Sequence, residues 1–498
     1  MLATSLRFAW HPLAICLLFF GFGCLVVLSP ALGAGVAALG VGLVLVAKGR
    51  FTVKLFVLVL LAVLMGYATM GRGFAHVGVR PFFVGEAALT LGVLALVVTL
   101  PTRRLNAVHV LILAFMSWGA FRTLPYIDAY GLDALRDAAS WGYALFAIVV
   151  SLLLQQQHLR GLITAYRGFV WFLVPWILVL ALVWAPLGDS FPRVPGTDVA
   201  IPSFKGGDMG VHLAGVAAFI LAGFLPASGW ARVAQPLLWL TWLMGFAVIA
   251  AVNRGGMLAV MVATSTVVFF TRQLRQWVAP TLAGVLLVAV GVTADVSLAE
   301  VGRGSEAGRE VSVGQLIDNF ASTVGESDDK RLSGTRAWRE RWWSEIVNYT
   351  FGGEYFWLGK GYGINLAEDD GFAGSDPELS DLRSPHNGHL QFLARGGVPG
   401  FALWLAVVLA FATTIARSAY RCHKHGKPEL LAVHAWIFAY WMAAVVNMSF
   451  DVYLEGPQGG IVFWSLVGLG IGVAAIAGET DATSVGPSAL ARPATGSR

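Results

Sequence analysis

The stretch "LFVLVLLAVLMGYATMGR", Leu55–Arg72, decides the fold class of this chain. It holds no charged side chain before Arg72, and most of its residues are large and apolar. A helix needs about 20 such residues to cross the hydrocarbon core of a bilayer. This run therefore predicts a transmembrane helix.

Similar apolar runs follow one another along most of the 498 residues, of which 57% are hydrophobic and only 13% charged. This composition is that of a membrane protein and excludes an ordinary soluble domain. The runs predict about fourteen membrane helices, at residues 13–29, 31–47, 55–72, 83–100, 107–122, 140–156, 167–184, 210–225, 233–251, 256–271, 278–294, 398–417, 431–449 and 459–478. The expected fold is an all-α polytopic membrane protein with one large extracytoplasmic loop subdomain.

The first apolar run follows Arg7 and has no clear small-residue cleavage site after it, so we interpret it as a retained span. Cys16 and Cys24 lie in this run and Cys422 in a basic loop. This spacing indicates neither a disulfide framework nor a metal site.

Basic residues gather in alternate loops, such as "KGRFTVK" and "RSAYRCHKHGK". Cytoplasmic loops of membrane proteins retain Lys and Arg, so both termini are predicted to be cytoplasmic. The chain then divides into helices 1–11 (1–294), an extracytoplasmic loop subdomain (295–397), helices 12–14 (398–478) and a disordered cytoplasmic tail (479–498). The net charge of +5 averages two oppositely biased faces and does not indicate nucleic-acid binding.

The outer segment 295–397 contains two local patterns. In "SGTRAWRERWWSEIVNYTF", Trp338, Trp342 and Ile346 recur at helical spacing, which is typical of packing more often than of a sugar platform. In "FWLGKGYGINL", Gly361 and Gly363 allow tight turns but are weak evidence for a phosphate loop.

The segment ends in "SPHNGHLQFLARGGVPG", Ser384–Gly400, where the chain is expected to re-enter the membrane at about Val398. Three interpretations compete. The stretch can be a turn with Ser384 or Asn387 as helix cap; His386 and His389, one helical turn apart, can be metal ligands, although no acidic residue or Cys completes a set locally; or His386 can be a general base.

A general base needs an electrophile, and the arginines suggest one. Arg254 stands in "NRGG" at the outer end of a span, where it either snorkels to the surface or faces a cavity or partner. Arg122 ends another span on the same side, and Arg336 and Arg339 lie in the outer segment. Guanidinium groups around a cavity would suit a diphosphate.

Four stretches resemble the O-antigen ligase and polymerase family of bacterial membrane glycosyltransferases: "RLSGTRAWRERWW", "FWLGKGYGINL", "LRSPHNGHLQFLARGGVPGFALW" and "FDVYLEGPQGGIVFW". The "NRGG" motif is similar to the intramembrane arginine motif of that family. The resemblance covers about Arg254–Trp464 and implies a GT-C-like, metal-independent enzyme without a cofactor, in the bacterial inner membrane with its active site facing the periplasm. The implied partners are membrane lipids, a polyprenyl (undecaprenyl) diphosphate glycan donor, and lipid A core or another glycan as acceptor; a chain-length regulator is a further candidate.

Carried over by residue, the resemblance implies that His386 is the base and that Arg254 contacts the donor diphosphate. Arg336 is the better loop arginine and Arg122 the weaker match. The supporting residues are Asn387, Gly361, Gly363 and Arg339. Asp451 and Glu455 can orient an arginine or bind acceptor sugar, but the favoured interpretation is that they are solvated loop acids. The expected function is O-antigen ligation in lipopolysaccharide or surface polysaccharide biosynthesis; the alternatives are a polymerase, or a polysaccharide or lipid transporter.

Overall fold

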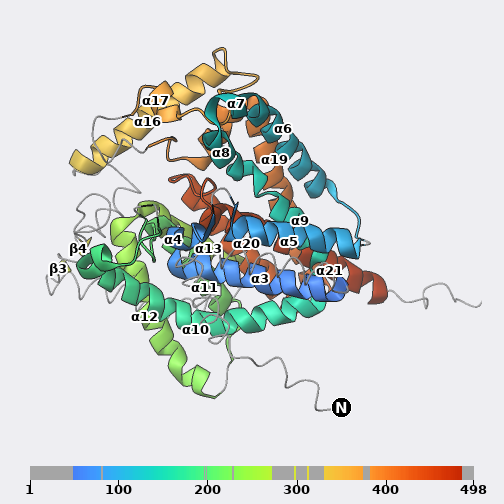
Figure 1. The fold of residues 1–498 in the computed structure, drawn as a ribbon. Helices are drawn as coiled ribbons and strands as arrows, with labels where there is room; N and C mark the ends of the chain where they lie inside the picture. Colours follow the sequence, from blue (N-terminus) through green and yellow to red (C-terminus); the bar gives the residue numbers. More distant parts are fainter. Residues whose placement is uncertain are drawn as a thin grey trace, which may run out of the picture.

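The computed structural model describes residues 49–79, 82–101, 103–195, 197, 199–226, 229–271, 297–298, 311–312, 330–373 and 382–484. In these ranges the chain is a bundle of helices with two very short hairpins (Figure 1). The predicted spans 13–29, 31–47 and 278–294 lie outside the described residues, as do most of 295–329 and residues 485–498 of the predicted tail. Residues 479–484, predicted as the start of a disordered tail, are helical.

The helices that form the bundle and its outer cover follow the chain in the order α3 (Gly49–Met70), α4 (Arg72–Ala75), α5 (Val84–Thr99), α6 (Ala107–Thr123), α7 (Ile127–Tyr130), α8 (Leu132–Gly142), α9 (Leu145–Leu153), α10 (Gln156–Leu187), α11 (Gly206–Leu221), α12 (Trp230–Val252), α13 (Arg254–Thr271), α16 (Lys330–Phe351), α17 (Leu366–Asp369), α19 (Gly388–Lys424), α20 (Pro428–Met448) and α21 (Pro457–Ser484). Two 3₁₀ turns cover Leu124–Tyr126 and Gly188–Ser190. The antiparallel hairpins pair β1 (Gly78–Val79) with β2 (Phe82–Phe83), and β3 (Ser297–Leu298) with β4 (Val311–Ser312).

Nine segments within the described ranges are long and apolar enough to cross a membrane, and α5 and α11 are shorter apolar helices of 16 residues each. Each coincides with a predicted span, which confirms an all-α polytopic membrane protein. The total of fourteen spans stays a prediction. The span predicted at 140–156 is built from two helices, α8 and α9, which meet around Tyr143.

Close helix packing depends on small residues where two backbones approach. Helix α13 packs against both α11 and α20. A Cβ added at Gly210 of α11 would lie only 2.7 Å from Gly256 Cα of α13. Small residues at such a crossing let two membrane helices gain van der Waals contact along their backbones. This packing brings the N-terminal ends of α11 and α13 together.

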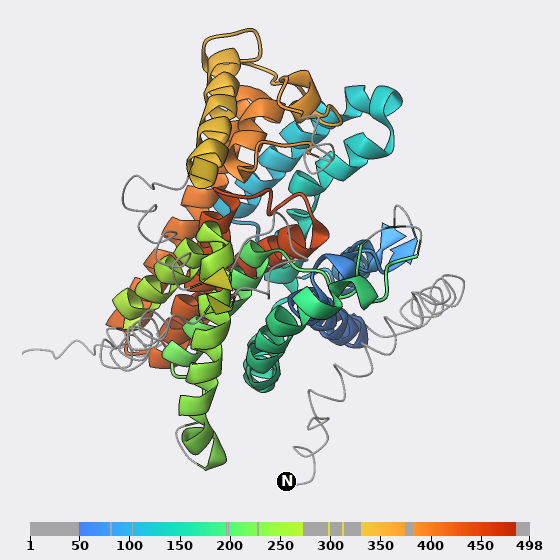
Figure 2. The ribbon, with the colours of Figure 1, turned by 90° about the vertical axis from the view of Figure 1, so that its left-hand side faces the viewer.

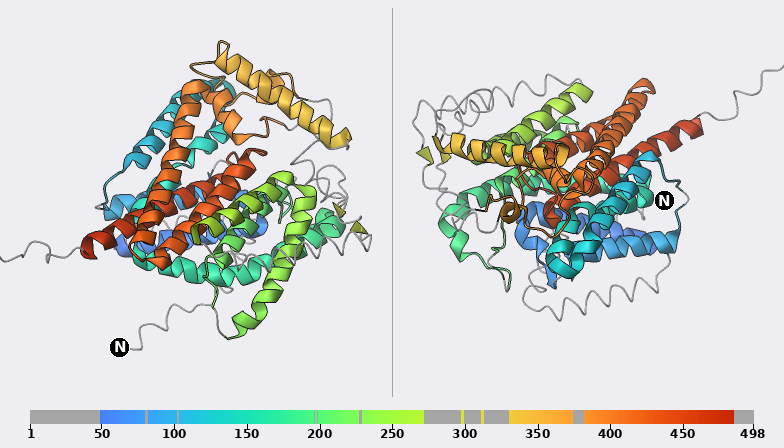
Figure 3. Two further views of the ribbon diagram at one scale, coloured as in Figure 1. Left: turned by 180° about the vertical axis from the view of Figure 1, so that it is seen from behind. Right: turned by 90° about the horizontal axis from the view of Figure 1, so that it is seen from above.

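Helix α19 links the outer cover to the membrane bundle. It packs against α6, α20 and α21, and Figure 3 shows α19, α20 and α21 side by side. It begins at Gly388, ten residues before the predicted re-entry at Val398, because Asn387 caps it there. The backbone breaks its helical course at Gly397, with φ 65°, just before Pro399.

Helix α16 lies along the outer part of α19 (Figure 2). Trp342 and Ile346 of α16 are fully buried against Leu393 and Ala394 of α19. The predicted tryptophan stripe therefore packs the outer cover onto the bundle, which confirms the packing interpretation for Trp342. This contact fixes α16 above the turn that precedes α19.

Candidate active site

His386 lies in the turn that leads into α19. Its backbone adopts φ 49°, a left-handed conformation that residues other than glycine adopt only occasionally. The Asn387 carboxamide Oδ1 accepts hydrogen bonds from the backbone N–H of His389 at 3.0 Å and of Leu390 at 3.1 Å. This is the N-cap geometry, so the capping interpretation of Asn387 is correct.

Two further contacts hold the turn from outside. The Trp343 indole of α16 donates to Pro385 O at 2.7 Å, and Ser384 Oγ donates to Glu455 Oε2 at 3.1 Å. The left-handed residue thus sits between three anchored neighbours. Strained backbone held in this way is common where a side chain must be aimed.

The aimed side chain faces a carboxylate. His386 Nδ1 lies 3.6 Å from Asp451 Oδ1, an ion-pair distance longer than a hydrogen bond, and Lys205 Nζ lies 3.2 Å from the same oxygen. Burial opposes ionisation of Asp451, but the Lys205 charge and His386 outweigh it and lower the pKa of this carboxyl below its ordinary value. Asp451 is therefore ionised and able to stabilise a protonated imidazole.

The start of α13 lies against the residue before Asp451. A Cβ added at Gly255 would lie 3.0 Å from Phe450 Cβ, and one added at Gly206 would lie 3.0 Å from Asn253 Cβ. The Asn253 side chain also caps α13 by accepting from Gly256 N–H at 2.7 Å. These approaches place Arg254, the half-buried first residue of α13, beside the turn that carries Asp451.

Helix α16 reaches the same turn from above. Arg339 Nη1 donates to Phe450 O at 3.4 Å. Arg336 lies three residues earlier on the helix, which is the spacing of neighbours on one helical face. The structure describes only the backbone of Arg336. Arg254, Arg339 and His386 thus converge on the turn Phe450–Asp451, which we call the outer cluster together with Lys205.

Arg122 belongs to a different group of residues. Its guanidinium donates from Nε to Leu358 O at 2.6 Å, and from Nη2 to Tyr126 OH at 3.1 Å and Gly359 O at 3.4 Å. The structure does not bring these contacts together with the outer cluster. Arg122 holds the glycine-rich loop against α6, and its role as a diphosphate ligand stays a prediction.

The two supporting glycines serve the same loop. Gly361 has φ 92°, and a Cβ there would lie 2.3 Å from a Tyr126 ring carbon. Gly363 has φ 112°, and its N–H donates to Asp137 Oδ2 at 2.8 Å. Both glycines are required by backbone conformation and close packing. Their contacts position the loop. The sequence pattern alone could not establish this role.

A buried ion network fixes this loop beneath α16. The fully buried Arg395 lies 2.9 Å from Asp137 Oδ2 through Nη1, and the same nitrogen donates to Ile364 O at 3.0 Å. Arg383 lies 3.7 Å from the same carboxylate oxygen. Burying a carboxylate between two guanidinium groups costs little free energy only when all three charged groups are held in contact. This network therefore fixes α8, the loop and α19 as one scaffold.

The two acids after α20 differ from the sequence interpretation. Asp451 and Glu455 were expected to be solvated loop acids, but the Asp451 side chain is only 12% exposed, and one carboxylate oxygen of Glu455 is fully buried. Burial raises the pKa of Glu455, against the opposing effects of Arg395, Arg136 and the Ser384 hydrogen bond. Both acids are buried because segments that are distant in the sequence pack over them.

His389 is part of the helix packing. Its Nδ1 accepts a hydrogen bond from the Trp404 indole at 3.1 Å, and its Nε2 lies 3.4 Å from Val445 O. Both ring nitrogens thus face protein groups, which does not favour a shared metal with His386. In the part of the chain that the structure describes, no group of three or more His, Cys, Asp and Glu side chains gathers in a way that could hold a metal ion.

Comparison with known proteins adds a family to this geometry. Residues 239–405 match the family model described as O-antigen ligase. The match contains Arg254, Arg336, Arg339 and His386, and it ends before Asp451. It confirms the resemblance seen in the motifs over 167 of the 498 residues. No curated protein matches the chain.

Proposed function

We propose that this protein transfers a glycan from a polyprenyl diphosphate donor to an acceptor hydroxyl at the outer face of the bacterial inner membrane. The observation that carries the proposal is the pairing of His386 with the ionised Asp451, beside Arg254 and Arg339. A base held by a carboxylate and flanked by guanidinium groups suits a displacement at a carbon that bears a diphosphate.

His386 acts as the general base. Its Nδ1 faces Asp451, so Nε2 is the nitrogen that takes the proton from the acceptor hydroxyl. The freed oxygen attacks the anomeric carbon, the new glycosidic C–O bond forms, and the bond from that carbon to the diphosphate oxygen breaks. Asp451 stabilises the imidazolium while the proton stays on His386.

The arginines stabilise the leaving group. Polyprenyl diphosphate gains negative charge as the C–O bond breaks. Arg339 brings a guanidinium to the Phe450–Asp451 turn, and Arg254 stands beside that turn at the start of α13. Arg254 is also the first residue of α13, where the helix dipole favours an anion. Arg336, one helical turn before Arg339 on α16, is proposed as a further donor contact. Because the leaving group needs little protonation, one base and this cationic clamp suffice, and no metal is required.

The orientation predicted from the basic loops supports a periplasmic site for this chemistry. The basic loops predict a cytoplasmic N-terminus and C-terminus, which puts the ends of α6, α10, α12 and α20 on the outer side. The outer cluster then lies at the level where lipid-linked glycans present their sugars. The first acceptor proposed is lipid A core, as for an O-antigen ligase; a second lipid-linked glycan would make the enzyme a polymerase. A chain-length regulator is a proposed partner for the polymerase case.

The acceptor is tested with purified protein in proteoliposomes that contain a polyprenyl diphosphate oligosaccharide. Lipid A core and a second donor molecule are offered in separate reactions, each run with and without EDTA. We expect a covalent product with lipid A core. A product only with the second donor would establish the polymerase, and no product with either acceptor, despite bound donor, would contradict the proposed function. Loss of product only when EDTA is present would contradict metal independence.

A further inference from the structure

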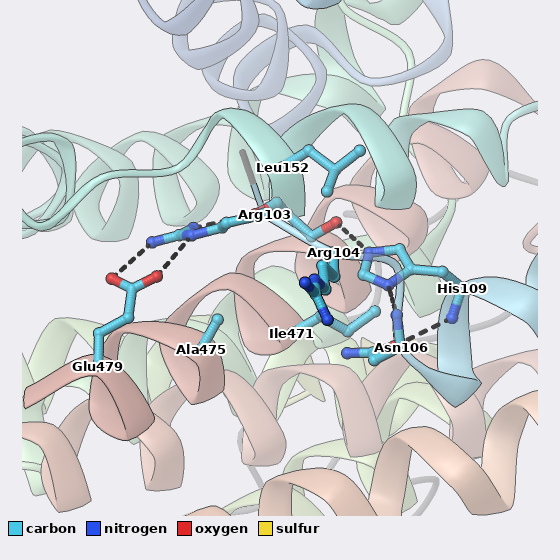
Figure 4. A pocket seen from close by; sticks show the side chains of 9 residues that line it. Arg103, Arg104, Asn106, His109, Leu152, Ile471, Ala475 and Glu479 are labelled. Atoms are coloured by element: carbon cyan, nitrogen blue, oxygen red, sulfur yellow. Dashed lines mark hydrogen bonds and ion pairs between the residues drawn. The ribbon is translucent and has the colours of Figure 1, made fainter. Parts of the chain in front are cut away.

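A polar cavity lies at the opposite end of the helices from the outer cluster. It is lined by Arg103, Arg104 and Asn106 before α6, His109 of α6, Ser151 of α9 and Glu479 of α21, with a volume of about 350 Å³ (Figure 4). Along α21, Pro457 and Glu479 are separated by about 33 Å at the helical rise per residue. The cavity is thus independent of the proposed transfer site.

The walls of the cavity are fixed by hydrogen bonds. Asn106 Oδ1 accepts from His109 N–H at 3.1 Å, and His109 Nδ1 accepts from Asn106 N–H at 3.0 Å, so the two residues cap α6 reciprocally. His109 Nε2 lies 2.7 Å from Ser151 Oγ, which ties this cap to α9. The polar groups are therefore held in place before any ligand binds.

The side chains that line the cavity carry two arginine charges and one carboxylate charge, so one positive charge is not balanced within the lining. Arg103 pairs with both carboxylate oxygens of Glu479, at 2.9 and 3.3 Å, and also donates to Ser151 O at 3.1 Å. Arg104 makes no hydrogen bond or ion pair with another described residue, and Figure 4 shows its guanidinium among the side chains that line the cavity. One positive charge at a capped helix N-terminus matches one phosphodiester.

The surface beside the cavity is apolar. Val97, Leu100, Leu105 and Val110 are each more than half exposed, and they flank Arg103 and Arg104 in the sequence. A free phosphate ion makes no use of such a surface, whereas the acyl chains of a phospholipid do. In the orientation predicted from the basic loops, the cavity faces the inner leaflet, where basic pockets between helices bind anionic headgroups.

We propose that this cavity binds the phosphodiester headgroup of an anionic phospholipid, with Arg104 as the main charged contact and the apolar strip along its acyl chains. Arg103 has a structural role, because its contacts with Glu479 and with Ser151 O of α9 hold the cavity wall together. This proposal does not depend on the transfer reaction or its substrates. The lipid site and the proposed function can therefore be refuted separately.

The test measures lipid binding to the lipid-stripped full-length protein in neutral detergent by native mass spectrometry. Phosphatidylglycerol and phosphatidylcholine are titrated against wild type, Arg104→Gln and the control Arg160→Gln. The control removes an exposed arginine near the start of α10 that does not line the cavity. We expect phosphatidylglycerol to bind wild type and Arg160→Gln about tenfold more tightly than phosphatidylcholine, and this preference to vanish in Arg104→Gln.

Three results would overturn the proposal. Equal affinity for the two lipids in wild type would remove the charge argument, and equal loss in Arg104→Gln and Arg160→Gln would remove the site. Displacement of phosphatidylglycerol by millimolar inorganic phosphate would assign the cavity to a free anion. Unchanged melting temperatures of both variants show that any loss of binding is local, because both side chains are exposed.

Discussion

At the scale of single residues, Asp451 is the group that gives His386 its direction and its charge partner. The Asp451→Asn variant keeps the shape of the side chain but removes the charge that faces Nδ1 across 3.6 Å. We expect kcat for glycan transfer to fall on the order of 100-fold, because the imidazolium loses its stabilising carboxylate. The KM for the donor should change little.

The conservative variant Asp451→Glu separates this positioning role from a purely structural one. It restores a carboxylate near His386 and Lys205, so part of kcat should return. Melting temperatures are measured for both variants. If Asp451→Asn lost activity only in proportion to lost folded protein, or if Asp451→Glu were no better than Asp451→Asn, the assignment of Asp451 would be wrong.

The buried Glu455 carboxyl should make the stability of the folded protein depend on pH. Because burial raises its pKa, the folded protein binds this proton more tightly than the unfolded chain does. The folded state therefore loses stability as pH rises above the unfolded pKa of about 4.3 and through the raised folded pKa. Glu455→Gln should raise the melting temperature at pH 7.5, and the difference from wild type should shrink at pH 4.

The control for Glu455 is Glu429→Gln, an exposed acid in the first turn of α20. Its melting temperature should follow wild type at both pH values. A Glu455→Gln protein that melts below wild type at pH 7.5 would show that the ionised carboxylate stabilises the fold, against the expectation.

The sequence predicts part of this residue-scale arrangement. His386 and Asn387 stand out because polar residues precede a long apolar run, and the cap at Asn387 follows from local hydrogen bonding alone. Asp451 and Lys205 could not be assigned, since their partners lie 65 and 246 residues away along the chain. No local spacing encodes such a contact.

At the scale of elements, α16 presents arginines to two different surroundings. Arg339 reaches Phe450 O, whereas Arg341 is exposed on the same helix. We expect Arg339→Gln to raise the KM for the donor about tenfold, because one charge-assisted contact to the diphosphate is lost. Arg341→Gln should leave KM unchanged in the same steady-state assay, and equal effects of the two substitutions would contradict a specific role for Arg339.

The kink of α19 predicts a packing cost. A Cβ at Gly397 would combine φ 65° with a contact of 2.7 Å to Phe356 O, while Gly426, with φ 64°, has open space around it. Both Ala variants carry the backbone strain of about 1 kcal/mol or more, but only Gly397→Ala adds the clash. Gly397→Ala should therefore melt at a clearly lower temperature than Gly426→Ala, and equal melting temperatures would refute a tight α19 kink.

Helices could be predicted from the sequence where a single feature, such as apolar length or residue spacing, indicated them. Apolar length located the described membrane helices, and the spacing of Trp342 and Ile346 located α16. The start of α19 was misplaced because hydropathy rises only after Gly397, while the helix itself begins at the cap of Asn387. Hydropathy reports burial in lipid, and the first turns of α19 are buried in protein instead.

At the scale of the whole molecule, the arrangement of helices follows from contacts that the sequence pattern does not contain. Helix α21 packs on α9, and α13 packs between α11 and α20, so neighbours in space are distant in the chain. The order of basic loops predicts on which side each helix end lies, but not which ends meet. The outer cluster arises because the end of α20, the starts of α11, α13 and α19, and the middle of α16 meet at one turn.

The central claim is that His386 is the base of a glycan transfer. Its most direct test measures product formation from a polyprenyl diphosphate oligosaccharide and acceptor in proteoliposomes, with wild type, His386→Gln and the control His423→Gln, which changes an exposed histidine in the last turn of α19. We predict that His386→Gln binds donor but forms product only at the background rate, while His423→Gln matches wild type. Transfer by folded His386→Gln at the wild-type rate would contradict the account.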